Sequence, residues 1–321
     1  MIRLNAQKLL TLLSEASAAW AEEGEARPAP MPVGGQAVIE GVLMKGYERW
    51  GLAVRKENGQ IVTEHWPAKN WAKKGLGRLP ILRGFLNMIE MLREGFKALS
   101  LSASISLGED DEMTTKDLVI TALTAAVMVI GLFVALPVWL ADLTKNAAGL
   151  SDWGAHVVEG CMRGLVFIAY LAVIGLWSDM ARIQAYHGAE HKTINAYESG
   201  RPMTPEAVME CSRLHPRCGT SFLLIVVVVS IIVFSAAGGG GIARRILMRV
   251  GLIPVVVGVS YEFIRAMSRF GRAGRCVMAP AMTLQYLTTR EPDAAQVEVG
   301  IRALETALDR KFDYKTTEAV R

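Results

Sequence analysis

The sequence contains few residues of the kinds that crosslink chains or bind metals. Its 321 residues include only four cysteines and five histidines. The cysteines have no paired spacing, so no disulfide framework is indicated, and on the cytoplasmic side of a membrane they would stay reduced. A secretory signal peptide is also missing from the start, where apolar residues are interrupted and a charged stretch rich in Ala and Pro follows. These absences argue against a secreted, disulfide-stapled protein.

Charge is absent from two long stretches. Residues 118–141 and 219–243 run for 24 and 25 residues without a charged side chain. About 20 apolar residues, each rising about 1.5 Å along a helix, cross a hydrocarbon core of roughly 30 Å. A soluble core helix of that length would need a polar face, and these stretches have none. They therefore predict an integral membrane protein.

Two further segments are weaker candidates for membrane spans. Residues 164–178 reach spanning length only by extending toward the N-terminus, which brings in Glu159 and Arg163. Those two side chains are four residues apart, so on a helix they can pair or face a protein interior. Residues 246–263 contain Pro254 and form either a full span or a re-entrant segment. The sequence thus predicts about four transmembrane helices in two hairpins.

Basic residues set the expected orientation of these spans. Lys and Arg are frequent before the first span and after the last one, whereas the first hairpin loop has only Lys145. This bias places both termini on the cytoplasmic side of a bacterial inner membrane, although Arg244, Arg245 and Arg249 near the second hairpin loop run against it. The net charge of +4 then reflects topology and attraction to lipid headgroups. We expect the lipid bilayer, and not nucleic acid, as the partner.

Outside the spans, the chain shows strand and helix patterns. Alternating residues on either side of Asn58-Gly59 predict a β-hairpin. An amphipathic helix is expected next, lying either on the membrane or on the core, with one face formed by Ile81, Phe85, Met88, Leu92, Phe96 and Leu99. A C-terminal helix has an apolar face of Val297, Ile301, Leu304 and Leu308, which we expect to dock or to support a homo-oligomer. The expected fold is a mainly α-helical polytopic membrane protein with a small N-terminal β-hairpin region and cytoplasmic amphipathic helices.

These patterns divide the chain into seven parts. They are a flexible N-terminal tail (1–30), a small β-containing cytoplasmic region (31–75), an amphipathic helix with an acidic linker (76–117), a first transmembrane hairpin (118–178), a segment with His, Glu and Cys motifs (179–219), a second transmembrane hairpin (220–265) and a cytoplasmic C-terminal region with an amphipathic helix (266–321).

The stretch "AYHGAEHKTINAYE" carries the first candidate for chemistry. On a helix with about 100° between residues, His187, Glu190, His191 and Glu198 all fall on one face. Residues four apart lie about 6 Å from each other, so His187 and His191 can bind one ion, with Glu190 beside them. This is the His-x-x-Glu-His order of inverted zincins, in which the histidines bind zinc and the glutamate is the base. The competing interpretation is a polar helix that binds no ion.

A second motif, "HPRCG", comes immediately before the third predicted span. It has the form of a zinc knuckle in which His215 replaces the first cysteine and Cys218 is retained. Pro and Gly would shape a tight loop whose backbone N–H groups point at the thiolate. Three of the five histidines fall within residues 187–215, close to this cysteine. The two motifs together predict a metal site, with zinc as the expected ion and another divalent metal as the alternative.

The number of ligands separates two kinds of site. Four protein ligands, His187, His191, His215 and Cys218, would close a tetrahedral zinc site of the structural kind. Three of them with an open position would make a catalytic site, in which zinc lowers the pKa of a bound water to about 7. Glu190 favours the catalytic alternative as a general base, although it would also serve as an outer partner of a ligand.

Three more side chains are candidates for a supporting or substrate-side role. Glu198 lies about two helical turns beyond His191, too far to share the ion on a straight helix. Glu40 stands inside an apolar, glycine-flanked run, either as an ordinary strand residue or reaching toward the site. Arg290 in "QYLTTREP" would pair with Glu40 or bind an anion.

Four stretches resemble one known family. "PVGGQAVIEGVLMKG", "AYHGAEHKTINAYE", "HPRCGTSF" and "LQYLTTREP" look like the signature blocks of the YqhQ-like bacterial membrane proteins, a domain of unknown function labelled a predicted metal-dependent enzyme. The resemblance runs in order from about Pro32 to Leu308 and leaves out residues 1–30, and Lys45 stands where the family usually has arginine. It implies a membrane protein with metal-dependent chemistry and names no substrate.

Two functions follow as hypotheses. The first is a zinc-dependent membrane enzyme, most simply a hydrolase, with its site at the cytoplasmic face and Glu190 as general base. The second is a scaffold or transport component without enzymatic activity, whose metal site pins residues 179–218 to the mouth of the bundle. Charges expected inside the membrane (Glu159, Arg163 and Glu262) favour the second hypothesis, because such charges often mark pathways.

Overall fold

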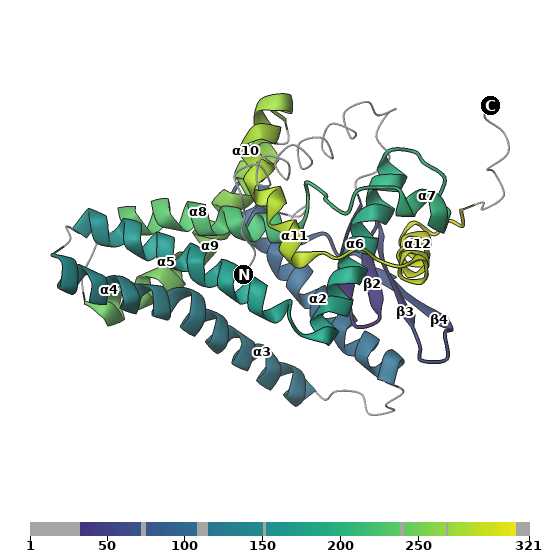
Figure 1. The fold of residues 1–321 in the computed structure, drawn as a ribbon, viewed down its shortest axis with the longest axis horizontal. Helices are drawn as coiled ribbons and strands as arrows, with labels where there is room; N and C mark the ends of the chain where they lie inside the picture. The colour runs from purple at the N-terminus through teal and green to yellow at the C-terminus, as the bar shows by residue number, and fades with distance from the viewer. Residues whose placement is uncertain are drawn as a thin grey trace.

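A computed structural model describes residues 33–71, 75–107, 115–149, 152–237, 241–267 and 269–312. The predicted N-terminal tail and most of the acidic linker lie outside these residues. The chain forms an elongated molecule with a small sheet at one end and long helices at the other (Figure 1). The elements in chain order are β1 (Gly34–Val38), β2 (Gly41–Lys45), β3 (Arg49–Arg55), β4 (Ile61–Pro67), η3 (Gly75–Arg78), α2 (Leu82–Leu107), α3 (Thr115–Ile130), η4 (Gly131–Ala135), α4 (Leu136–Ala148), α5 (Asp152–Ile174), α6 (Ser178–Glu198), α7 (Pro205–Met209), α8 (Gly219–Ala236), α9 (Ile242–Met267), α10 (Gly271–Thr283), α11 (Gln285–Thr288) and α12 (Ala294–Leu308).

The four strands form one antiparallel sheet in the order β1-β2-β3-β4. The hairpin predicted at Asn58-Gly59 is confirmed, because Arg55 pairs with Ile61 across a turn in which Gly59 has a φ of 84°. Glycine adopts this left-handed conformation without steric cost, which explains its place in the turn. The β1–β2 turn is less usual, since Glu40 takes a φ of 50° there.

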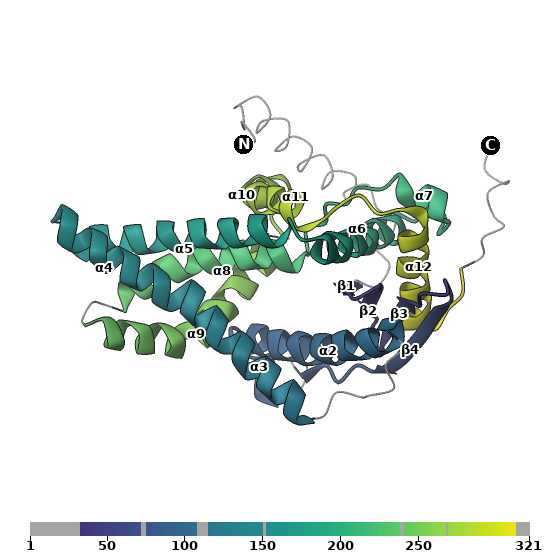
Figure 2. The same ribbon diagram turned by 60° about the horizontal axis from the view of Figure 1, so that its bottom comes forward.

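Both faces of the sheet are buried. Val42 and Met44 point to one face, where they join a core with residues of α6 and α12, while Leu43 points to the other and packs near Ala98 of α2. Figure 2 shows α6 and α12 on one side of the strands and α2 on the other. The result is a three-layered body with the sheet in the middle.

The helix α2 packs on β3 and α9, and whether its other face lies on the membrane stays a prediction. Leu92 and Leu99 of the expected apolar face are 55% and 40% exposed, while Glu90 is fully buried, so this helix turns carboxylates to the sheet. Glu90 accepts a hydrogen bond from Lys45 Nζ at 2.9 Å, and Glu94 accepts one from the indole of Trp66 at 2.8 Å. Polar partners on the sheet therefore allow carboxylates to face inward.

Three helical stretches within the described residues are long and apolar enough to cross a membrane: Val119–Lys145, Val157–Ile174 and Gly219–Ala236. The first joins α3 to α4 through the π-helical turn η4. Much of its surface is exposed apolar side chain, as a lipid-facing helix requires. The fourth predicted span corresponds to α9, which contains Pro254 and several arginines and is not among the three. Whether it crosses the bilayer stays a prediction.

The predicted pairing of Glu159 with Arg163 is confirmed. Arg163 Nη2 lies 2.8 Å from a Glu159 oxygen, and Arg249 of α9 donates two more hydrogen bonds to the same carboxylate, at 2.6 and 2.7 Å. Arg245 pairs with Asp142 of α4 at 2.6 Å. Two of the three arginines that ran against the charge bias are therefore buried partners of acidic side chains, and they carry little information on topology.

The helix α12 begins with a capping box made by Asp293 and Gln296. Its apolar side chains Val297, Ile301 and Leu304 are buried against the sheet and α6 of the same chain. The docking predicted for this helix therefore occurs inside the molecule, and a homo-oligomer through its other face stays a prediction.

Candidate metal site

The helix α6 positions the first two candidate ligands. It is polar in sequence, yet residues 184–196 are almost all buried between the sheet, α12 and the 199–218 loop. Its polar side chains find partners on that loop: Lys192 donates to the carbonyls of Met209 and Cys211, and Asn195 donates to those of Ser212 and Leu214. These bonds satisfy loop carbonyls that burial would otherwise leave without a partner. They also hold the loop against the helix.

Backbone carbonyls orient both imidazoles. His187 Nδ1 lies 2.9 Å from the Thr288 carbonyl, and His191 Nδ1 lies 2.6 Å from the Arg213 carbonyl. A carbonyl oxygen only accepts, so each Nδ1 must carry a proton, and Nε2 is the ring nitrogen that can bind an ion. Metal-binding histidines are typically oriented in this way.

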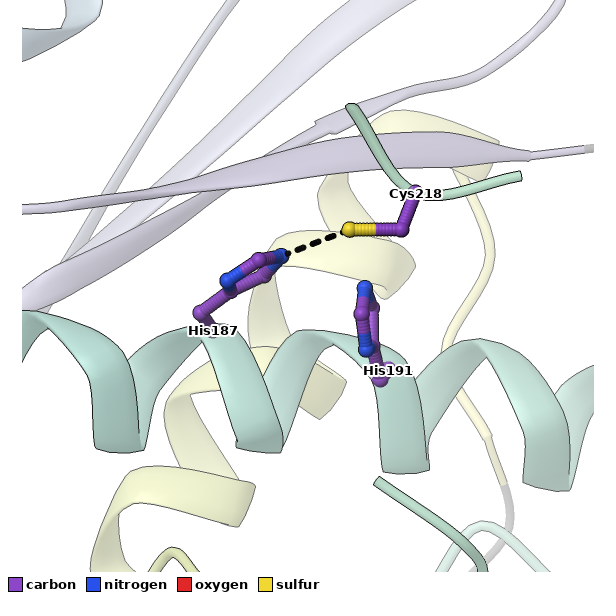
Figure 3. Close-up of side chains that lie close together, drawn as sticks. All are labelled: His187, His191 and Cys218. Carbon is purple, nitrogen blue, oxygen red and sulfur yellow. Dashed lines mark hydrogen bonds between the residues drawn. The ribbon is translucent and has the colours of Figure 1, made fainter. Parts of the chain in front are cut away.

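Cys218 completes a group of three converging atoms. It is the N-cap of α8, and its sulfur accepts a hydrogen bond from the Thr220 backbone N–H at 3.4 Å. The sulfur lies 3.3 Å from His187 Nε2 and points between the two rings (Figure 3). The candidate ligand atoms of His187, His191 and Cys218 all lie within 4.8 Å of one another. This donor set and spacing suit a zinc ion, for which Zn–N and Zn–S distances are about 2.0–2.3 Å.

The electrostatics of the three residues favour a thiolate. Burial by itself would raise the pKa of Cys218, but the adjacent His187 and His191 hold this pKa well below its ordinary value. Burial likewise disfavours charge on His187, yet the neighbouring sulfur and Glu190 raise the pKa of this histidine to about 9. A metal-free site therefore holds a thiolate beside an imidazolium, and a divalent cation would displace the imidazolium proton on binding.

Glu190 lies beside the three ligands. One of its oxygens is 3.9 Å from His187 Nε2, and the side chain is almost completely buried. Burial raises the pKa of this carboxyl group, while the two histidines oppose the shift. Gly35 of β1 makes room for Glu190, since a Cβ at Gly35 would lie 3.0 Å from Glu190 Cγ and 2.6 Å from the Leu43 carbonyl oxygen.

His215 and Glu198 form a separate pair next to this group. His215 Nε2 lies 3.5 Å from Glu198, which also pairs with Arg217. The His215 ring centroid is 5.7 Å from that of His191, and His215 is not one of the three residues with converging ligand atoms. The structure thus brings together three of the four predicted ligands and places Glu198 beside the fourth.

Glu40 and Arg290 lie apart from each other, so the pairing predicted between them is wrong. Glu40 instead pairs with Arg182 and accepts a hydrogen bond from the Tyr186 hydroxyl at 3.2 Å. Arg290 donates to the Gly175 carbonyl at 2.7 Å. Arg182 lies one turn before Tyr186 on α6, and both side chains contact Glu40 in the β1–β2 turn. Arg182 therefore takes the place that the sequence suggested for Arg290.

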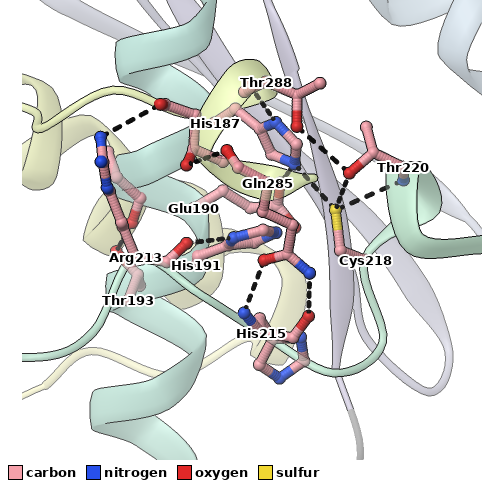
Figure 4. Close-up of polar contacts among 12 residues, drawn as sticks. His187, Glu190, His191, Thr193, Arg213, His215, Cys218, Thr220, Gln285 and Thr288 are labelled. Carbon is pink, nitrogen blue, oxygen red and sulfur yellow. Dashed lines mark hydrogen bonds and ion pairs between the residues drawn. The ribbon is translucent and has the colours of Figure 1, made fainter. Parts of the chain in front are cut away.

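Three residues that support the site were not identified from the sequence as functional. The buried amide of Gln285 binds both the backbone N–H of His215, at 2.9 Å, and its carbonyl, at 2.7 Å. Thr288 supplies the carbonyl for His187, and its hydroxyl lies 3.2 Å from that of Thr220, which contacts the Cys218 sulfur at 3.1 Å (Figure 4). The "LQYLTTREP" block contains Gln285 and Thr288, but the types of these uncharged residues do not by themselves indicate a role in the site.

Comparisons with known proteins cover most of the chain. A family model described as "Protein of unknown function (DUF1385)" matches residues 79–310. The chain is 32% identical over 296 residues to "Uncharacterized protein YqhQ" of Bacillus subtilis (strain 168), which covers 87% of this chain and 93% of that protein. No solved structure matches. The predicted resemblance is confirmed, and neither description assigns a reaction.

Proposed function

This chain belongs to the DUF1385 family, and we propose that it is a zinc-dependent enzyme of the bacterial inner membrane, most simply a hydrolase. His187, His191 and Cys218 would hold the ion and Glu190 would act as general base. The site and both termini would face the cytoplasm. The observation that carries the proposal is the convergence of two Nε2 atoms and one thiolate beside a buried carboxylate, with both Nδ1–H groups held by backbone carbonyls.

Three protein ligands suit a catalytic zinc ion, because the fourth position stays open for water or substrate. When bound there, zinc would lower the pKa of a water to about 7 and polarise a carbonyl or phosphoryl oxygen. His187 is the most accessible of the ligands, with 17% of its side chain exposed, so a substrate would approach from its side.

Glu190 would supply the proton transfer. Its carboxylate lies 3.9 Å from His187 Nε2, so it would be placed beside the ion and could accept and return a proton there as a general base. Burial raises the pKa of Glu190, which strengthens it as a base toward water. The fixed tautomers of His187 and His191 would keep both Nε2 lone pairs on the ion throughout.

A second candidate function is a scaffold or transport component without enzymatic activity. The carboxylate of Glu159 with Arg163 and Arg249, buried among α5, α8 and α9, supports it, because charges inside a membrane bundle often mark pathways. In that case the metal would only join α6 to the start of α8.

Replacing Glu190 by Gln separates the two functions. The amide keeps the size of the side chain and removes its basicity. For an enzyme, purified Glu190→Gln protein should keep about one zinc per chain, measured by mass spectrometry of the metal, while complementation of a deletion strain fails, since general-base catalysis contributes about 10²–10⁴-fold. Glu210→Gln, at an exposed position of the 199–218 loop, serves as the control and should behave as wild type.

Two outcomes would contradict the proposal. A zinc-loaded Glu190→Gln protein that complements fully would exclude the proposed enzymatic function but not the proposed metal site. Wild-type protein that binds no divalent metal would exclude both the catalytic and the structural function proposed for the site.

A further inference from the structure

A basic hollow lies between the start of α2 and the end of α9, and none of the metal-site residues lines it. Its volume is about 310 Å³, and its lining consists of Arg83, Glu262, Arg265, Ala266 and Arg269. Three arginines against one glutamate leave a formal charge of +2. A volume near 300 Å³ is at the lower end of the range of small-molecule sites.

Close packing of the two helices builds this hollow. A Cβ at Gly84 would lie 2.6 Å from Tyr261, and one at Gly258 would lie 2.4 Å from the Ile81 carbonyl oxygen. These glycines let α2 approach α9 closely enough for Arg83 to donate both Nε and Nη2 to Glu262. Arg83 is thereby held at the wall of the hollow.

The backbone at its rim is strained. Ile81 has a φ of 69°, which is rare for a β-branched residue and unfavourable. Residues held in such conformations cluster at functional sites and ligand clamps. Ile81 packs closely on Gly258, and this packing holds Ile81 in its unfavourable conformation.

The surroundings of the hollow are apolar and exposed. Leu79 and Leu82 flank Arg83, with exposed fractions of 52% and 36%, and Phe270, which follows Arg269, is 61% exposed. The hollow also lies where the apolar run of α9 ends. Arginines bordered by exposed apolar side chains are typical of a protein surface that contacts the headgroup layer of a membrane.

We propose that this hollow binds a phosphate group, carried either by an acidic lipid headgroup or by a soluble phosphate ester. Guanidinium groups bind phosphate oxygens with paired, charge-assisted hydrogen bonds, and three arginines line this hollow. The volume admits a headgroup and leaves acyl chains to lie on the apolar side chains around it. Glu262 positions Arg83 by accepting two hydrogen bonds from its guanidinium.

The test is a binding titration of full-length protein in a neutral detergent. The probes are short-chain dihexanoyl phosphatidylglycerol, the matching phosphatidylcholine, and glycerol phosphate. If phosphatidylglycerol binds saturably and at least about tenfold more tightly than the other two probes, the ligand of the hollow is a lipid headgroup. Glycerol phosphate binding at least as tightly as phosphatidylglycerol identifies a soluble phosphate ester.

Two variants tie the binding to the hollow. Arg265→Gln with Arg269→Gln should weaken the better probe by at least about tenfold, since hydrogen bonds to charged groups contribute that much or more each. Ala266→Glu, which keeps every arginine, should weaken it as well by filling the hollow with negative charge. The charge-matched control combines Arg201→Gln with Arg310→Gln, two exposed arginines on loops after α6 and α12.

Zinc content and melting temperature should be unchanged in each variant, which shows that the fold is intact. Equal affinity of the double variant and its control, or no saturable binding of any phosphate probe by the wild type, would overturn the proposal.

Discussion

The two histidines of α6 differ from His215 in where their rings are anchored. His187 and His191 each give Nδ1–H to a backbone carbonyl, which leaves Nε2 free to bind an ion. In His215 the backbone is held by Gln285, while ring Nε2 lies beside Glu198. The anchoring contacts therefore favour His187 and His191 as candidate ligands, which agrees with the prediction from the sequence, where His215 was only an alternative or a fourth ligand.

We expect the zinc content of purified variants to reflect this difference between the histidines. His191→Ala and Cys218→Ser each remove a ligand, so purified protein should lose most of its zinc. His215→Ala should keep about one zinc per chain, with affinity lowered by no more than about 10–100-fold, the usual effect of changing a group next to a ligand. Metal analysis of the three purified variants checks this. Loss of zinc in His215→Ala equal to that in His191→Ala would indicate a closed site with four ligands.

At the scale of elements, α6 and the β3–β4 hairpin show two ways in which the conformation of a segment is determined, by local residues or by tertiary contacts. The hairpin depends on one local feature, the left-handed Gly59, whose N–H donates to the Lys56 carbonyl at 2.9 Å. The helix α6 depends on its surroundings, because its polar side chains are buried only where the 199–218 loop supplies carbonyls. The hairpin was accordingly visible in the sequence, and the burial of α6 was not.

The turn of the hairpin can be tested with two glycines. Gly59→Ala should destabilise the protein by about 1–2 kcal/mol, because a Cβ is unfavourable at a φ of 84° even though open space surrounds it. Gly34→Ala is the matched control, since a Cβ there also meets open space and the φ is not positive, and it should be nearly neutral. Melting temperatures of the detergent-purified variants compare the two. Equal melting temperatures would mean that the turn relaxes to accept alanine.

At the scale of the whole molecule, buried charges join the long helices. Glu159 accepts hydrogen bonds from Arg163 of its own helix and from Arg249 of α9, and Arg163 also donates to Ser230 of α8 at 2.8 Å. One carboxylate thus holds two arginines that are each at least 95% buried. Removing one partner of a buried pair leaves an uncompensated charge, which costs far more than the pair contributes.

Glu159→Gln should therefore destabilise the bundle strongly, by about 3–5 kcal/mol. The control is Glu298→Gln, which breaks the partly exposed pair with Arg55 and should cost less than about 1 kcal/mol. Thermal unfolding in detergent measures both variants. A Glu159→Gln protein as stable as its control would show that water or lipid headgroups reach the two arginines.

The orientation of the whole molecule is open to a reporter test. A reporter fused after Arg321 should behave as cytoplasmic, and one inserted into the α4–α5 connection near Asn146 should behave as external, because basic residues favour the cytoplasmic side. An external reporter at Arg321 would reverse the predicted topology and put the metal site on the other side of the membrane.

The sequence by itself determined the features that depend on neighbours along the chain. Charge-free length predicted the membrane helices, Asn58-Gly59 predicted the hairpin, and four-residue spacing predicted both the Glu159–Arg163 pair and the shared face of His187 and His191. Each of these follows from backbone geometry within one or two turns, which a sequence displays directly.

Only the tertiary structure decided which distant residues meet. In the folded protein Cys218 lies beside His187, and His215 lies beside Glu198. Glu40 pairs with Arg182 and not with Arg290, and the buried Glu90 pairs with Lys45. Spacing along the chain sets none of these contacts, because they depend on how α6, the sheet and the start of α8 pack together. Packing between segments far apart in the sequence therefore decided the ligand set of the candidate site, and local periodicity could only propose its members.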